Sequence, residues 1–159
     1  MANAADARLH EVVQKALKGA DDATVAIVAA CAGLLACVGY ADRELSEGEL
    51  SKAGHLLATV EGIGPEGSRA IVQAIQAHVV ELSSVHTTRF ARTLKELGHR
   101  ELRLHILGML LELAAVDDHV SHSEVNTLRQ VTRALGLTQD DYNHLQSEHR
   151  QKLGTLRGG

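Results

Sequence analysis

The stretch ADRELSEGE at residues 41–49 is matched 75 residues later by the stretch VDDHVSHSE at residues 116–124. Each has an aspartate at its second position, an aliphatic residue at its fifth and the pattern Ser-x-x-Glu at its sixth to ninth. Ser-x-x-Glu is typical of a capping box, in which the serine and glutamate side chains bind backbone amides at the start of a helix. The two stretches therefore predict two helices whose structural caps are Ser46 and Ser121.

A strongly apolar segment precedes each of these stretches. Val25 to Ala41 holds seventeen residues without a charge, and Glu101 to Ala115 is the corresponding segment in the second half. Apolar positions inside the two capped helices also coincide at the same offset, since Leu50 corresponds to Val125. Self-similarity at a fixed offset indicates two structurally equivalent units. We place the repeat units at about residues 25–60 and 100–135.

Helical periodicity continues through the rest of the chain, with apolar residues three and four positions apart and glycines between the segments. Only one proline and three aromatic residues occur, and most of the apolar residues are Ala, Leu and Val, which suits closely packed helices. At 159 residues the chain has the size of one domain. We expect an all-α fold, a single compact bundle of about seven to eight helices over residues 1–159. The expected helices are 4–18, 21–40, 46–60, 65–82, 85–97, 101–115, 121–135 and 139–153.

Charge and hydropathy exclude several classes of protein. The net charge of −4 and the lack of a Lys/Arg run argue against binding to nucleic acid. The segment 25–41 is shorter than the ~20 residues that span a bilayer and is rich in Ala and Gly. It predicts a buried core helix and no stable membrane insertion. Residues 1–20 carry charges and lack the apolar centre of a signal peptide, so we expect a cytoplasmic protein.

No catalytic motif is found in the sequence. Nucleophile-elbow, phosphate-loop, zinc-protease and dinucleotide-binding patterns are all missing. Cys31 and Cys37 are six residues apart on one expected helix, about 9 Å along its axis, which is too far for a disulfide. We interpret them as core thiols and expect that the protein is not an enzyme.

Asp42 and Asp117 each follow the C-terminal end of an apolar helix, where the helix dipole disfavours negative charge. Each aspartate could accept loop amides in an Asx-turn, or it could bind a divalent cation together with neighbouring acids. The spacing excludes an EF-hand, so oxygen ligands in a shallower site would suit Ca, Mg or Mn. In the second loop His119 and His122 make Zn or Ni possible. The candidate metal ligands are Asp42, Glu49, Asp117, Asp118, His119, His122 and Glu124.

The duplicated pattern Ala-Asp-x-x-Leu/Val-Ser-x-x-Glu, preceded each time by an apolar helix, resembles the tellurite-resistance TerB family. Members of that family typically show Ala-Asp-Gly-x-Ile/Val-Ser-x-x-Glu in each half. The resemblance covers about residues 25–140. This chain departs from the pattern where Arg43 and Asp118 replace the glycine and where Val116 replaces the alanine.

The resemblance implies a compact helical bundle, a role in tellurite and oxidative-stress resistance in bacteria, and a divalent cation at the acidic cluster. The matching positions are Asp42, Ser46, Glu49, Asp117, Ser121 and Glu124. Our first hypothesis is a non-enzymatic stress-resistance module that binds divalent cations at paired acidic loops and joins an assembly with protein partners. The alternative is a purely structural protein–protein interaction domain with no metal role, in which the acidic loops serve only as caps.

Overall fold

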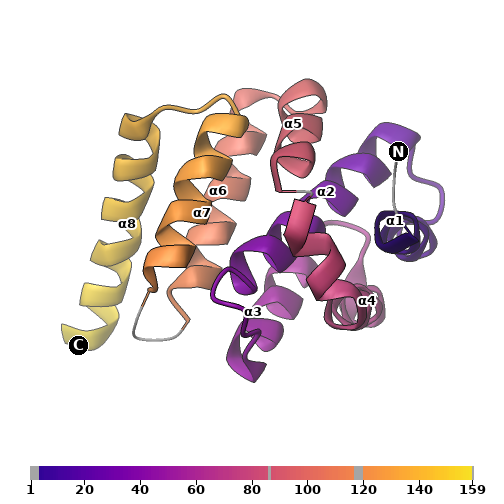
Figure 1. Cartoon of the computed structure of the whole chain (residues 1–159), viewed down its shortest axis with the longest axis horizontal. Helices are drawn as coiled ribbons and strands as arrows, with labels where there is room; N and C mark the ends of the chain where they lie inside the picture. Colours follow the sequence, from indigo (N-terminus) through magenta and orange to yellow (C-terminus); the bar gives the residue numbers. More distant parts are fainter. Residues whose placement is uncertain (1–3, 86, 117–119, 159) are drawn as a thin grey trace.

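The structure is a computed structural model that describes residues 4–85, 87–116 and 120–158. For residues 84, 85 and 150–158 it describes the backbone alone. These ranges form eight α-helices and no strand (Figure 1). The helices are α1 (Ala4–Ala16), α2 (Asp22–Gly39), α3 (Glu47–Ala58), α4 (Gly64–Val85), α5 (Thr87–Leu97), α6 (Arg100–Ala114), α7 (His122–Ala134) and α8 (Gln139–Gly158). The predicted all-α bundle is confirmed, and each expected helix corresponds to one observed helix.

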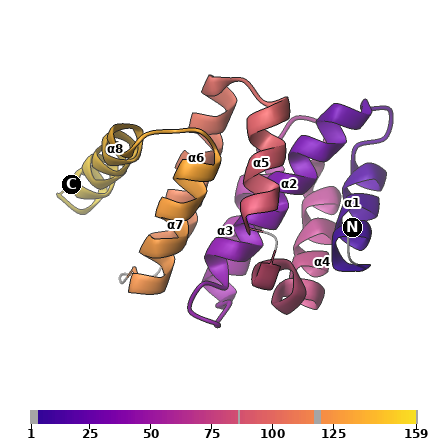
Figure 2. The ribbon, with the colours of Figure 1, turned by 45° about the horizontal axis from the view of Figure 1, so that its top comes forward.

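Helix α2 is the centre of the bundle. It contacts α1, α3, α4, α5, α6 and α7, and every residue from Val28 to Gly39 is buried. Figure 2 shows α5 between α2 and α7, with α1 and α4 on the other side of α2. Of the described helices, only α2 is long and apolar enough to cross a membrane, yet 67% of it is buried inside the bundle. The expectation of a buried core helix is therefore confirmed.

The helix pairs α2–α3 and α6–α7 keep the offset of 75 at their junctions. Helix α2 ends at Gly39 and α6 at Ala114, while α3 begins at Glu47 and α7 at His122. The pairs also contact each other reciprocally, because α2 packs on α6 and α7 while α6 packs on α2 and α3. The structural equivalence of the two complete units stays a prediction. The helix ends show the offset of 75 residues, and the helix–helix contacts show only that the two pairs pack on each other.

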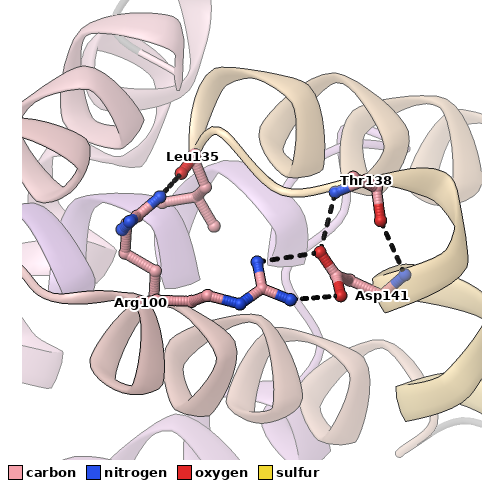
Figure 3. Close-up of polar contacts among 5 residues, drawn as sticks. Arg100, Leu135, Thr138 and Asp141 are labelled. Atoms are coloured by element: carbon pink, nitrogen blue, oxygen red, sulfur yellow. Dashed lines mark hydrogen bonds and ion pairs between the residues drawn. The ribbon is translucent and has the colours of Figure 1, made fainter.

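A polar cluster joins the start of α6 to the start of α8 (Figure 3). Arg100 donates to both carboxylate oxygens of Asp141, at 2.7 and 3.2 Å. Asp141 also accepts the amide of Thr138 at 2.9 Å, and its own amide donates to the Thr138 hydroxyl at 3.1 Å. The bond to Arg100, followed by that to Thr138, lowers the pKa of Asp141 to about 2. This carboxylate therefore caps α8 and ties it to α6 at the same time.

Candidate functional site

The two acidic loops end in capping boxes of matching geometry. In the first, the Ser46 hydroxyl accepts the amide of Glu49 at 3.1 Å, and the Glu49 carboxylate accepts the amide of Ser46 at 3.1 Å. Ser121 and Glu124 repeat both bonds, again at 3.1 Å. Both serines have nearly the same backbone angles, φ −71° with ψ 160° or 159°. The predicted structural caps are confirmed at both positions.

The capping glutamates are unusual because they are buried. Glu49 is 4% exposed and Glu124 is 5% exposed, whereas glutamate is almost never fully buried unless it is paired. The capping box supplies such a partner, the serine amide. In the first unit the other carboxylate oxygen of Glu49 lies 3.7 Å from where a Cβ on Gly39 would be, and so faces the end of α2. Each glutamate is thus held in orientation by its capping box at the start of its helix.

Asp42 takes part in turn chemistry. Its carboxylate accepts the amide of Glu44 at 3.1 Å, which is the Asx-turn that the sequence allowed. Arg43 follows with φ +66°, the left-handed region that side chains with a Cβ rarely adopt. The pattern Ala-Asp-Gly-x-Ile/Val-Ser-x-x-Glu has glycine at the position of Arg43. This conformation gives the physical reason, because glycine adopts positive φ without strain. Arg43 and Asp42 form no ion pair with each other, although both lie in the described part of the chain.

The described residues do not bring the candidate ligands of the first loop into one cluster. Asp42 is exposed while Glu49 is buried in its cap, and no group of three or more His, Cys, Asp or Glu residues in the described ranges could hold a metal ion. In the second loop, His122 is exposed at the first position of α7 and Glu124 is buried in its cap. Asp117, Asp118 and His119 lie outside the described residues.

Both cysteines lie in the core of α2. Cys31 and Cys37 are free and buried, and burial raises the pKa of each thiol to about 12. Cys37 donates its thiol hydrogen to the carbonyl of Leu82 at 3.5 Å. Since the thiolate is the nucleophilic and reducing form, these two thiols are inert at neutral pH while the bundle is folded.

A cavity of about 660 Å³ opens beside the first acidic loop, and no motif in the sequence indicated it. Its lining comes from the end of α2, the α2–α3 loop, α4, the start of α5 and α7. Most of the lining side chains are polar: Tyr40, Arg43, Ser83, Thr87, Thr88, Thr127 and Gln130. The only sequence signal was Arg43 in place of glycine, because the other lining residues come from separate segments that only the fold brings together.

The family model described as tellurite resistance protein TerB matches residues 28–147, which include both acidic loops and all helices from α3 to α7. No curated protein and no solved structure matches the chain.

Proposed function

Since this chain belongs to the TerB family of tellurite resistance proteins, we propose that it is a non-enzymatic, cytoplasmic module of a tellurite and stress response. It takes a divalent cation at an acidic loop and joins an assembly of proteins. The observation that carries this proposal is the buried glutamate Glu124, which a capping box holds at the end of the acidic stretch 116–124. A role in binding rather than catalysis is also supported by the protonated, buried thiols of Cys31 and Cys37.

The two loops differ in their suitability for a cation. The first loop suits a cation less well, because one carboxylate oxygen of Asp42 already accepts the Glu44 amide and Arg43 adds a positive charge next to it. The second stretch, residues 116–124, contains no Lys or Arg and adds a second aspartate and two histidines. We therefore place the cation at the second loop.

The ligands there would be chosen from Asp117, Asp118, His119, His122 and Glu124, with water completing the coordination. Carboxylates alone would favour Ca, Mg or Mn, whereas participation of imidazole would favour Zn or Ni. When bound, a cation would neutralise neighbouring carboxylates. The loop with its cation would then offer a partner protein a surface that depends on the cation.

Thermal unfolding in a chelator and in Mg, Ca, Mn, Ni or Zn tests the cation site. An ion at about 100 times its Kd adds ~2.7 kcal/mol, which raises the Tm of a domain of this size by roughly 5–11 °C. Asp117→Asn should abolish that rise, and the matched variant Asp42→Asn should keep it. His119→Ala should remove the response only if the ion is Zn or Ni. A response that survives Asp117→Asn but is lost in Asp42→Asn would contradict the placement.

The second candidate function is the interaction domain without a metal. It is favoured by one observation, that the capping box and the Asx-turn account for Ser46, Glu49 and Asp42 without any ligand. In that case none of the five ions at millimolar concentration changes the Tm of the wild type. Ser121→Ala would then lower stability by ~1 kcal/mol equally with and without metal.

A further inference from the structure

The cavity beside the first acidic loop is built from segments far apart in the sequence. Helix α2 contacts α4, α5 and α7, and its C-terminal end supplies Cys37 to the lining. Helix α4 is kinked at His78, where φ is −123° and ψ is 18°, and the part after the kink supplies Val80 and Ser83. At about 660 Å³ the cavity lies within the ~300–1,000 Å³ of typical small-molecule sites.

The chemistry of the lining is dominated by hydrogen-bonding groups. Five hydroxyl side chains and one amide contribute to it: Tyr40, Ser83, Thr87, Thr88, Thr127 and Gln130. Hydroxyls and amides both donate and accept hydrogen bonds, so they match the hydroxyl groups of a polyol or sugar. Val80 is 61% exposed and adds an apolar surface for the carbon skeleton of such a ligand.

Arg43 is the only charged side chain among the described residues that line this cavity, and no carboxylate accompanies it. It makes no ion pair or side-chain hydrogen bond within the described ranges. Two other hollows carry carboxylates in their lining. Asp6 and Glu11 line the one between α1, α2 and α5, and three glutamates line the one between α6 and α8.

The backbone of Arg43 strengthens the case for a role of its side chain. A glycine would adopt φ +66° without strain, yet the chain carries a long cationic side chain at this point. Strained backbone positions for residues with a Cβ cluster at binding sites, where the side chain has a use.

We propose that this cavity binds a small molecule with one oxyanion group, a phosphate or a carboxylate, attached to a hydroxyl-rich body. Arg43 pairs with the oxyanion through charge-assisted hydrogen bonds. The hydroxyl and amide side chains of α4, α5 and α7 hold the body. This site uses none of the residues proposed as cation ligands in the second loop.

Titration of the full-length protein, followed by calorimetry and by amide chemical shifts, tests the site with four probes. Glucose 6-phosphate carries a phosphate, gluconate carries a carboxylate, glucose carries no charge, and inorganic phosphate is the ion alone. We expect one charged sugar to bind at least about tenfold more tightly than glucose and inorganic phosphate, with shifts at Thr87, Thr88, Thr127 and Gln130. Tighter binding of glucose 6-phosphate indicates a phosphate ligand, and tighter binding of gluconate indicates a carboxylate ligand. No binding of either charged sugar at about 10 mM overturns the proposal.

Variants separate this site from a general effect on the fold. Arg43→Gly should weaken binding of the charged sugar by about ten- to a hundredfold, the usual worth of a hydrogen bond to a charged group. The same change should raise the Tm without ligand, because glycine relieves the positive φ. Arg92→Ala removes an equal charge from the exposed surface of α5 and should leave binding unchanged. Equal binding by Arg43→Gly and wild type, or shifts confined to other surfaces, would refute the assignment.

Discussion

An alanine should have opposite effects at Gly33 and Gly108, two positions related by the offset of 75 residues. On Gly33, a Cβ would lie 2.5, 2.6 and 2.7 Å from three ring atoms of Phe90. Ordinary contacts to a Cβ begin at 3.4 Å, so the ring must retreat by about 1 Å from a close-packed site. On Gly108, nothing lies within 4 Å of the added Cβ.

The magnitudes follow from two opposing terms. Overpacking a core costs ~1–3 kcal/mol, and we take the upper value because Phe90 is only 8% exposed and three of its atoms clash. Replacing a helical glycine by alanine stabilises the folded state by ~1 kcal/mol in either helix. Gly33→Ala should therefore lose ~2 kcal/mol and roughly 4–8 °C of Tm, while Gly108→Ala should gain up to ~1 kcal/mol and roughly 2–4 °C.

Urea and thermal unfolding of the two variants measure these changes. A double-mutant cycle with Phe90→Leu isolates the contact, because Gly33→Ala should cost much less once the ring is gone. If Gly33→Ala is as stable as the wild type, or if both alanines shift the Tm in the same direction, the packing of α5 on α2 described above is wrong.

Three further predictions concern the caps, the thiols and pH. Ser46→Ala should lower stability by ~1–2 kcal/mol in urea unfolding, whereas Ser46→Asp, which keeps an oxygen acceptor, should lose much less. Cys31 and Cys37 should not react with a disulfide reagent at about pH 8 until urea unfolds the protein, when two thiols should titrate; fast labelling of the native state would contradict their burial. Asp141 has a folded pKa of about 2, below its ordinary value of 3.8, so its stabilising effect is present above about pH 4 and lost as the pH falls towards 2. The Tm difference between wild type and Asp141→Asn should therefore shrink over that interval; a difference that is constant from pH 6 to pH 2 would contradict the bond to Arg100.

Parts of the candidate site could be predicted and parts could not. The caps at Ser46 and Ser121 were predicted because a capping box joins residues only three apart, so its pattern is visible in four letters of sequence. The Asx-turn of Asp42 was one of two alternatives, since the same aspartate pattern suits a turn or a cation. The cavity at Arg43 was not predicted, because its lining spans residues 37 to 130 and no local pattern connects them.

The sequence by itself determined the helices, their order and the caps at Ser46 and Ser121, because periodicity and capping act within one or two turns of chain. Tertiary structure alone decided what each helix position touches. Gly33 and Gly108 hold the same place in the repeat. Phe90 of α5 packs on Gly33, whereas nothing lies within 4 Å of a Cβ added at Gly108. Arg100 and Asp141, 41 residues apart, meet only because α6 and α8 pack side by side. Such contacts depend on how helices pack against one another, and that packing is set by the whole core rather than by any short stretch.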